Sequence, residues 1–237
     1  MGAAMAAFRL LSYNVRSLLN GRPAVAQVIR ACQPDAVCVQ ESPRGFRWRA
    51  GCAALARESG LRMIAGGWPA GLLILGGPRV TTVHAERFLL SLVPDRLQRG
   101  LTLAVLDVGG RRVTVADIHL DLNDGWRRRH AAEVLRHLDR VSVKYGTPAV
   151  VAGDVNEEPG SPAWQMLTGR LRDAYAVAPA GGELTFPARR PQVRIDAIFT
   201  GAGIGVAGCG VPEEPADSGM AAASDHLPVL ASLELPG

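Results

Sequence analysis

The sequence contains little lysine, few aromatic residues and no long apolar run. Lys144 is the one lysine among 26 basic residues. Aromatic residues make up 5% of the chain, which leaves few flat rings on which the bases of a single-stranded nucleic acid could stack. No apolar run reaches the ~18 residues typical of a membrane span. The lead-in from Met1 to Phe8 lacks the charged and apolar regions of a signal peptide, so we expect a cytoplasmic protein without a membrane span.

The spacing of the cysteines and the absence of several well-known motifs argue against some kinds of metal site and catalytic nucleophile. Cys32, Cys38, Cys52 and Cys209 form no CxxC pair, which argues against a zinc site. They fit small buried apolar residues in a reducing compartment. The motifs HExxH, GxxxxGK[ST] and GxSxG are missing. The sequence therefore gives no support to a zinc protease, a P-loop enzyme or a serine hydrolase.

The overall composition is that of a folded protein. The 237 residues, 48% of them apolar and 20% charged, predict one globular domain over residues 1–237, which we expect to act as a monomer. The net charge of +4 favours phosphate-bearing partners. This preference is mild, because an excess of Arg beside so much Ala and Gly also fits the codon usage of a GC-rich genome.

Apolar periodicity predicts more strands than helices. Helices are expected over 23–32, 46–59 and 126–145, with another beginning near Ser161. Strands are expected over 8–13, 36–39, 72–75, 101–108, 111–120, 149–152, 195–200 and 227–233, and Gly109-Gly110 predicts a hairpin. The stretch 208–223 predicts a long loop bordering a site. The pattern favours mixed or antiparallel sheets covered by helices.

Chemically active side chains recur where the predicted strands begin or end. Asn14, Glu41, His119 and Asp154 each end an apolar strand, and Asp225-His226 precedes the last one. Strands that run in opposite directions bring such ends to a common rim. Buried carboxylates are costly unless they are paired or bound to metal, so the arrangement predicts a cation site.

The segment Gly153-Asp154-Val155-Asn156 is the sharpest local motif. In extended backbone, Asp154 and Asn156 point the same way, and Gly153 permits a close approach at the strand exit. The alternative is a strand-ending turn, because Gly, Asp and Asn all favour turns.

Two histidines complete the candidate site. Asp196 can pair with His226, which would orient the ring and raise its pKa. His119 shares a strand face with Val113 and Val115, so it either packs in the core or donates to a phosphate oxygen beside it. Glu41 and Asn14 are oxygen ligands, and such ligands without cysteine favour Mg²⁺ or Mn²⁺ over Zn²⁺.

Six motifs in order resemble the endonuclease/exonuclease/phosphatase superfamily of deoxyribonuclease I-like enzymes. They are Ser12-Tyr13-Asn14-Val15, Val39-Gln40-Glu41, Ile118-His119-Leu120, Gly153-Asp154-Val155-Asn156-Glu157, Arg194-Ile195-Asp196 and Ser224-Asp225-His226. The chain departs from the family in having Asp117-Ile118 where Asn-Thr is common, and Ala197 where Tyr is common. It is also short for the family, which leaves little room for long DNA-gripping loops.

The resemblance implies an α/β (α+β) fold: a four-layer α/β/β/α sandwich of two mixed, largely antiparallel sheets, with the site at one rim. It implies Mg²⁺ or Mn²⁺ as cofactor, with Glu41 as main ligand and Asn14 and Asp225 beside it. The metal would stabilise charge that builds on the phosphate oxygens.

The resemblance also implies catalytic roles. Asp154 would orient or deprotonate the attacking water, and Asn156 would position phosphate or water. His226, held by Asp196, would stabilise the pentacovalent phosphorus. His119 would contact phosphate.

The expected function is metal-dependent hydrolysis of phosphate esters. The cluster Arg127-Arg128-Arg129 favours a nuclease acting on DNA or RNA, in which these residues bind the substrate; the alternative for the cluster is ordinary exposed surface. The competing functions are a phosphatase or phosphodiesterase of a small phosphorylated metabolite or lipid head group, and a catalytically dead binding module on the same scaffold.

Overall fold

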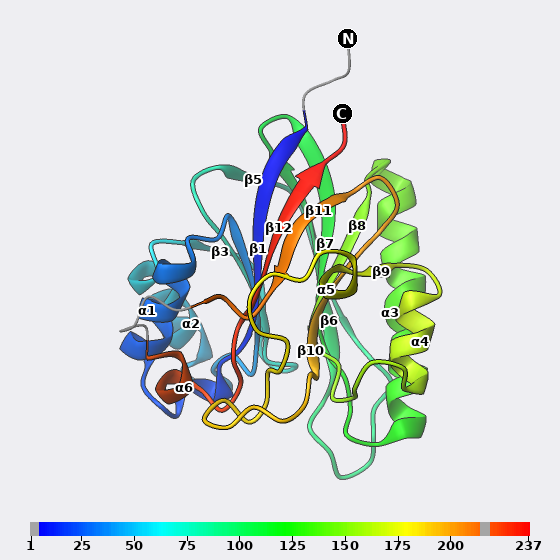
Figure 1. Ribbon diagram of the computed structural model, residues 1–237. Helices are drawn as coiled ribbons and strands as arrows, with labels where there is room; N and C mark the ends of the chain where they lie inside the picture. The colour runs from blue at the N-terminus through cyan, green and yellow to red at the C-terminus, as the bar shows by residue number, and fades with distance from the viewer. Residues whose placement is uncertain (1–4, 214–218) are drawn as a thin grey trace.

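Two six-stranded sheets pack face to face in a computed structural model that describes residues 5–213 and 219–237 (Figure 1). The first sheet has the order β11 (Gly205–Gly210), β12 (Val229–Leu235), β1 (Ala6–Asn14), β2 (Ala36–Gln40), β4 (Leu72–Gly76), β3 (Arg62–Gly67). The second has the order β5 (Val80–Leu89), β6 (Gly100–Val108), β7 (Arg111–His119), β8 (Ala149–Asp154), β10 (Asp196–Thr200), β9 (Arg172–Asp173). The pairs β1–β2 and β7–β8 are parallel, and the other pairs are antiparallel.

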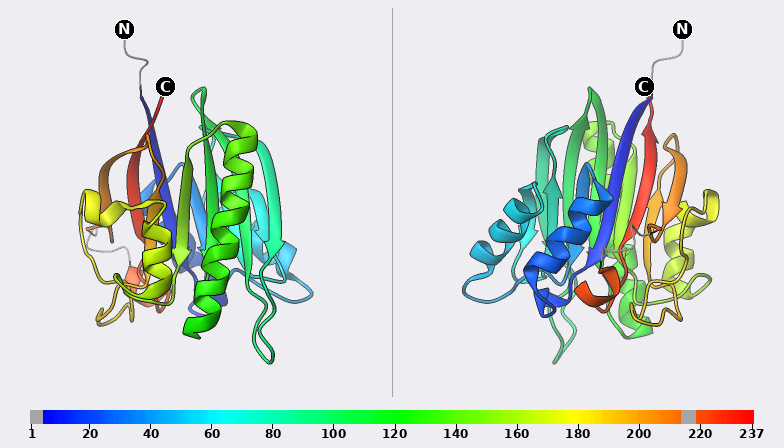
Figure 2. Two further views of the ribbon diagram at one scale, coloured as in Figure 1. Left: turned by 90° about the vertical axis from the view of Figure 1, so that its right-hand side faces the viewer. Right: turned by 60° about the vertical axis from the view of Figure 1, so that its left-hand side comes forward.

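Helices cover the outer face of each sheet, so the predicted four-layer α/β/β/α sandwich is confirmed (Figure 2). The first sheet is covered by α1 (Arg22–Cys32), α2 (Trp48–Glu58) and the short α6 (Met220–Ala223). The second is covered by α3 (Asp124–Tyr145) and α4 (Pro162–Thr168). A 3₁₀ turn, η1 (Arg16–Leu18), follows β1, and α5 (Ala174–Val177) follows β9.

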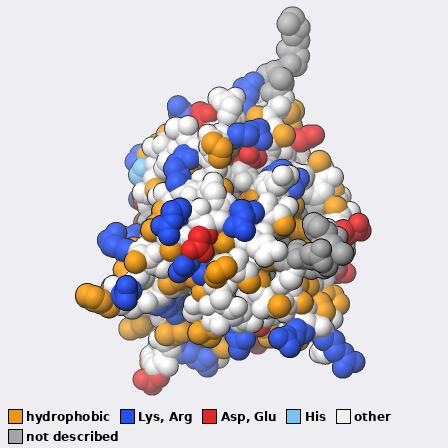
Figure 3. All heavy atoms as spheres, turned by 90° about the vertical axis from the view of Figure 1, so that its left-hand side faces the viewer, with side chains coloured by type: hydrophobic (Ala, Val, Ile, Leu, Met, Phe, Trp, Pro, Cys, Tyr) orange, Lys and Arg blue, Asp and Glu red, His pale blue; other side chains and the backbone are white. Residues whose placement is uncertain are grey.

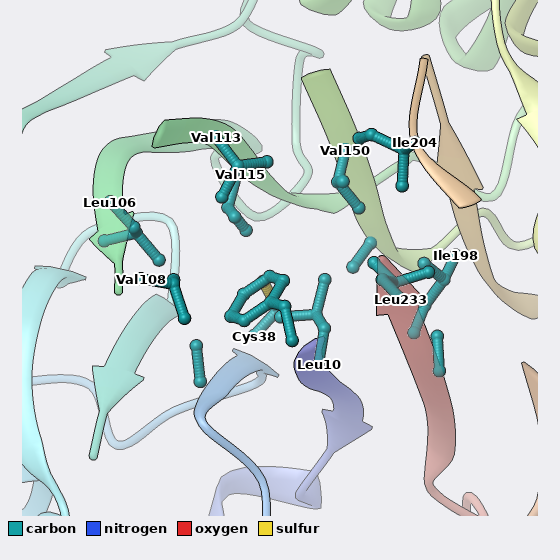
Figure 4. Close-up of a cluster of buried hydrophobic side chains, with 14 of the residues drawn as sticks. Leu10, Cys38, Leu106, Val108, Val113, Val115, Val150, Ile198, Ile204 and Leu233 are labelled. Atoms are coloured by element: carbon teal, nitrogen blue, oxygen red, sulfur yellow. The ribbon is translucent and has the colours of Figure 1, made fainter. Parts of the chain in front are cut away.

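The central core lies between the two sheets and takes side chains from both (Figure 4). Leu10 and Cys38 of the first sheet meet Val115 and Val150 of the second. Because side chains alternate along a strand, the residues between them face the helices instead; Leu11 and Tyr13, for example, pack with α1 and α2. This burial on both faces explains why β2 is apolar from Ala36 to Val39.

The predicted hairpin is present, because Gly109 and Gly110 both have positive φ, 61° and 81°, as a two-residue turn of this kind requires. The loop predicted over 208–223 was wrong at both ends: β11 continues to Gly210 and α6 begins at Met220. The middle of that stretch, 214–218, and the lead-in residues 1–4 lie outside the described residues.

The first and last strands are neighbours. Ala6 pairs with Leu235 and Ser12 with Val229 in one antiparallel ladder. The amino end of β1 and the carboxyl end of β12 therefore lie at one pole of the molecule, and Asn14 lies at the other (Figure 1). No helix in the described ranges is long and apolar enough to cross a bilayer.

Candidate active site

The inner faces of both sheets end in polar side chains at one rim. On β1, Phe8 and Leu10 belong to the inter-sheet core, and Ser12 and Asn14 continue the same face. The same alternation places four predicted site residues on the inner face: Asn14 (β1), His119 (β7), Asp154 (β8) and Asp196 (β10). The core face thus becomes polar where the strands leave the sandwich.

Asp196, His226 and Asp154 form a buried row of charges. Nδ1 of His226 lies 2.9 Å from Oδ2 of Asp196, and Nε2 of the same ring lies 3.8 Å from Oδ2 of Asp154. Asp154 and Asp196 are direct partners in the β8–β10 ladder. The backbone N–H of His226 lies 3.4 Å from Oγ of Ser224, which donates in turn to the carbonyl of Asn14. The ring is therefore fixed between two carboxylates.

This environment raises two pKa values, which favours the charged form of His226 and the neutral form of Asp154. Burial by itself would lower the pKa of His226, but Asp196, Asp154 and Asp225 outweigh it and raise the pKa to about 9. Burial and the neighbouring Asp196 raise the pKa of Asp154 to about 7, against the opposing effects of His226 and of hydrogen bonds from Asn14 and Asn156. The imidazole is thus a cation beside a carboxylate suited to accept a proton.

Asn14 links the two halves of the site. Its Nδ2 lies 3.0 Å from Oδ2 of Asp154 and 3.4 Å from Oε1 of Glu41. Its Oδ1 accepts the backbone N–H of Arg16. Glu41 is half-buried, and in the described part of the chain its carboxylate forms no ion pair within 4.0 Å.

Three backbone positions shape the rim. Glu41 and Asn156 are non-glycine residues with positive φ, 52° and 55°, a conformation that turns each side chain out of the regular alternation. Gly153 has φ 153°, and a Cβ there would lie 2.0 Å from the carbonyl oxygen of Ile118. Glycine therefore lets β7 and β8 approach closely just before His119 and Asp154 emerge.

His119 lies in the site and not only in the core. Its Nε2 is 3.4 Å from Oδ2 of Asp154, and its buried Nδ1 has no hydrogen-bond partner among the described residues. Burial, together with Arg99, His226 and Arg44, holds the pKa of His119 well below its usual range, so the ring is neutral. A neutral ring can offer one N–H to a substrate oxygen.

Asn156 and Asp225 lie at the edges of this group. Asn156 donates from its backbone to Oδ1 of Asp154 at 2.9 Å and from Nδ2 to the carbonyl of Leu120 at 3.0 Å. Asp225 directly precedes His226, and its Oδ2 pairs with Nε of Arg16 at 3.3 Å. Asp225 therefore has a cationic partner, unlike Glu41.

The three consecutive arginines have different environments. Arg127 is buried: it pairs with Glu157 at 2.6 Å, with Asp124, and with the carbonyls of Asp121 and Leu122. Arg129 lies over the ring of Trp126 and pairs with Glu133 at 3.3 Å. Arg128 is exposed. The structure thus gives Arg127 and Arg129 different protein partners.

Comparison with known proteins agrees with the geometry. The model of the endonuclease/exonuclease/phosphatase family matches residues 11–226, from β1 to His226. The chain belongs to the endonuclease/exonuclease/phosphatase family. No curated protein sequence matches it significantly.

Solved members of the endonuclease/exonuclease/phosphatase fold superpose over almost the whole chain. The endonuclease/exonuclease/phosphatase from Bacteroides vulgatus is 25% identical, with a TM-score of 0.79 over 97% of this chain and 99% of that chain. A mannosyl-6-phosphatase from Bacteroides thetaiotaomicron is 22% identical, with a TM-score of 0.80 over 95% and 99%. The human Nocturnin catalytic domain, solved with a bound sulfate anion, is 18% identical, with a TM-score of 0.75 over 99% and 96%. These similarities show the shared fold.

Two arginines at the site were not predicted from the sequence. Arg99 is buried, and within the part of the chain that the structure describes Nε of its guanidinium has no hydrogen-bond partner; it lies 4.0 Å from the carboxylate of Asp121. Burial lowers the pKa of Arg99, while Asp154, Asp121 and Glu41 act to raise it. Arg44 is half-buried and donates to the carbonyl of Ala70 at 3.0 Å. The one available signal was position, since Arg99 directly precedes the strand that pairs with β7.

The donor set fits the divalent cation on which enzymes of this family typically depend. Ligand atoms of Asp154, Asp196 and His226 lie within 4.8 Å of one another, close enough to hold a metal. The Nδ1 of His226 is already engaged by Asp196, whereas the Glu41 carboxylate has the amide of Asn14 as a hydrogen-bond partner and, among the described residues, no ion pair within 4.0 Å. A carboxylate without a cationic partner, next to an amide and the buried Asp154, is a typical oxygen site for Mg²⁺ or Mn²⁺. Glu41 is therefore the better placed ligand.

Proposed function

We propose that this protein hydrolyses phosphate esters by metal-assisted attack of water. The observation that carries the proposal is the buried row Asp196–His226–Asp154, with 2.9 and 3.8 Å between successive groups, beside the unpaired carboxylate of Glu41. A cation, a base and an unpaired carboxylate at one rim are what in-line displacement at phosphorus needs.

The metal would be held by Glu41, with Asn14 and Asp225 as further ligands. When bound, it supplies Lewis-acid stabilisation of the charge that builds on the phosphate oxygens. Binding through Asp225 would have to compete with its ion pair to Arg16, so we assign Asp225 the weaker part.

The protein's own groups would do the remaining chemistry. Asp154, whose pKa is raised to about 7, would orient the water and take its proton. His226, kept charged by Asp196, would donate to a non-bridging oxygen as the phosphorus becomes five-coordinate. His119 and Arg99, each with a buried nitrogen that lacks a partner, would contact the same phosphate, and Asn156 would hold Asp154 in place.

For the substrate, nuclease action on DNA or RNA remains a candidate. The support from the arginine cluster is weaker than the sequence indicated, because Arg127 is buried in protein contacts and the exposed Arg129 pairs with Glu133, while Arg128 is exposed. Other exposed arginines near the rim, among them Arg16 and Arg189, still favour an anionic polymer. The second candidate is a phosphatase or phosphodiesterase of a smaller phosphate ester, which the fold shared with a mannosyl-6-phosphatase supports.

We also propose that residues 1–237 form one domain that acts as a cytoplasmic monomer. The inter-sheet core draws on both sheets, which supports one cooperative unit. The four cysteines are buried free thiols, in keeping with a reducing compartment.

An assay panel tests the proposed function. Plasmid DNA, RNA, an aryl phosphodiester and a phosphomonoester are each incubated with Mg²⁺, Mn²⁺ or EDTA, with Asp154→Asn as the control for contaminating activity. We expect turnover of at least one substrate that needs metal and is lost in the variant. Absence of turnover on all substrates with either metal would favour the catalytically dead scaffold.

A further inference from the structure

Large apolar side chains stand exposed in the loops around the candidate site. Of the twelve such side chains in the described ranges, six lie in these loops: Leu19, Phe46, Trp68, Leu92, Leu97 and Leu122. We call these six the rim tips. Phe46 is fully exposed, and Leu92 and Leu97 are 65% and 67% exposed. They come from five separate loops, each at a strand end that borders the site.

The loop that carries Leu92 and Leu97 is held in shape by its own contacts. Leu90 and Val93 point inward and are buried. The backbone N–H of Leu90 donates to the carbonyl of Arg99, and the amide of Gln98 donates to the carbonyls of both residues at 2.8 Å. The loop therefore buries two apolar side chains and presents two others to solvent, as a built surface would.

Cations lie among the rim tips. Exposed arginines on the same loops and on the adjoining helix starts are Arg47, Arg49, Arg96 and Arg128. Figure 3 shows hydrophobic and basic side chains side by side along the lower end of the molecule, the end away from the amino terminus. This mixture is complementary to a surface with negative charge on the outside and an apolar layer beneath it.

An apolar groove opens beside the site. It has a volume of about 530 Å³ and runs between the edge strands β3 and β5, with Trp68, Phe88 and Leu101 in its wall. Ala70 lines it as well, and the carbonyl of Ala70 accepts a hydrogen bond from Arg44. Arg49 and Arg87 line the groove beside its apolar side chains, and Arg44 contacts it through Ala70. Apolar walls with cations among them suit a phosphate group with a hydrocarbon chain attached.

We infer that the rim is a docking surface for an anionic lipid membrane, on which the site acts on lipid phosphate esters. Exposed arginine suits nucleic acid as well, but four of the six rim tips are leucine, which offers no flat ring to a base. Aliphatic tips gain from hydrocarbon instead. The docking stands apart from catalysis, and only the choice of substrate rests on the proposed function.

Vesicle flotation with the whole protein tests the docking. Vesicles of phosphatidylcholine alone and of phosphatidylcholine with phosphatidylglycerol are compared for wild type, the double variant Leu92→Ser/Leu97→Ser, and Val143→Ser. Val143 is the matched control, because it is 81% exposed but lies near the carboxyl end of α3, away from the rim. We expect wild type and Val143→Ser to bind the anionic vesicles, and the double variant to bind at least ~10-fold more weakly, since apolar insertion supplies much of the binding.

Several results would overturn the inference. The first is that wild type does not bind the anionic vesicles, and the second is that Val143→Ser loses as much vesicle binding as the double variant. The third is that wild type ignores vesicles but binds a single-stranded oligonucleotide tightly, and that the double variant abolishes this binding. A dimer seen by light scattering that the double variant dissolves, without vesicle binding, would assign the rim to a second copy of the chain. Turnover of a water-soluble aryl phosphodiester separates the two proposals. The double variant should still hydrolyse it, because the rim tips are not part of the catalytic group. Wild type that binds vesicles but hydrolyses no substrate would refute the proposed function and leave the docking intact.

Discussion

Glu41 occupies a backbone conformation that is uncommon for its residue type. A φ of 52° in a residue with a side chain costs on the order of 1–3 kcal/mol, and glycine would relieve that cost. A glycine would also remove the carboxylate that has no ion-pair partner. The strain is therefore consistent with a side chain that is kept for what it binds.

We predict that Glu41→Gln abolishes Mg²⁺-dependent turnover while the protein stays folded, because the amide keeps the size of the side chain and loses its charge. Isothermal titration with Mg²⁺ and a turnover assay measure the two effects, and circular dichroism checks the fold. Glu158→Gln, which changes an exposed carboxylate near the rim, is the control and should behave as wild type. Unchanged Mg²⁺ affinity in Glu41→Gln would refute the metal assignment.

Asp154→Asn and His226→Ala should each lower turnover by at least ~10²-fold, because each removes a group that acts as charge moves in the transition state. The double variant should be little worse than the poorer single one, since both groups serve the same step. Steady-state rates on the best substrate measure this. Near wild-type turnover in either single variant, or fully additive losses, would contradict the proposed mechanism.

The sequence was informative about site residues that follow apolar strands, and uninformative about arginines in loops. Asn14, Glu41 and Asp154 could be found because a polar residue at the end of a buried strand is costly without a role. Arg99 could not, and Arg127 was predicted to bind substrate and not to be buried, because an arginine in a loop or a first helical turn is ordinarily solvated. Their burial arises from tertiary contacts with Asp121 and Glu157, which no local pattern reports.

At the scale of elements, Arg127 joins three segments of the chain. It lies in the first turn of α3, and it donates hydrogen bonds to the carbonyls of Asp121 and Leu122, which follow β7. It also pairs with Glu157. Glu157 in turn accepts the first N–H groups of α4, those of Ala163 and Trp164. The ion pair therefore fixes where α3 and α4 begin relative to the rim.

We predict that Arg127→Gln lowers the free energy of unfolding by ~3–5 kcal/mol, because it leaves the Glu157 carboxylate buried without its partner. Arg128→Gln, its exposed neighbour, is the matched control and should change it by less than ~0.5 kcal/mol. Urea unfolding followed by circular dichroism gives both values. Equal, small effects in the two variants would mean that Arg127 is not a structural residue.

How well each helix or strand could be predicted from the sequence depends on how much of it is buried. Helices α1, α2 and α3 and the strands with two buried faces were found within a few residues, since their apolar patterns are continuous. Strands β3, β5 and β11 and the two-residue β9 were not predicted. β5 is mostly exposed or half-buried along its length, and β3 and β11 contain several glycines, so pairing with a neighbouring strand defines them more than their own side chains do.

At the scale of the whole molecule, one carboxyl group bridges the two sheets. Asp117 of β7 accepts a hydrogen bond from the Gln40 side chain at 2.7 Å and from the backbone of Leu73 at 3.0 Å, both on the opposite sheet. Burial raises the pKa of Asp117 well above its usual range, and these hydrogen bonds only partly offset the effect. The sheets are thus joined through a group that resists ionisation.

This bridge predicts a pH dependence of stability. Above about pH 4 the unfolded chain releases the Asp117 proton while the folded protein still holds it, so rising pH favours unfolding through this group. Asp117→Asn removes the effect, and the Gln40 oxygen, which has no partner, can accept from the new amide. We expect the melting temperature of the variant to gain on wild type as pH rises from 4 towards neutrality.

Thermal melts at several pH values test this, with Asp139→Asn as the control because its carboxylate is exposed on α3. A constant difference between Asp117→Asn and wild type at all pH values would show that Asp117 ionises as easily in the folded protein as in the unfolded chain.

The pairing of Ala6 with Leu235 also determines which face of the protein a tag, a fused partner or a solid support would cover. The nine residues of β1 separate that pole from Asn14 by roughly 25–30 Å. A flexible linker, an affinity tag or a fused partner joined at either end would therefore hold the molecule by the pole opposite the rim, with the candidate site facing outward and unobstructed. An immobilised form should keep full access for a bulky substrate, and a short peptide joining the two ends should give a circularly permuted protein that opens at the Gly109-Gly110 turn without disturbing the chemistry.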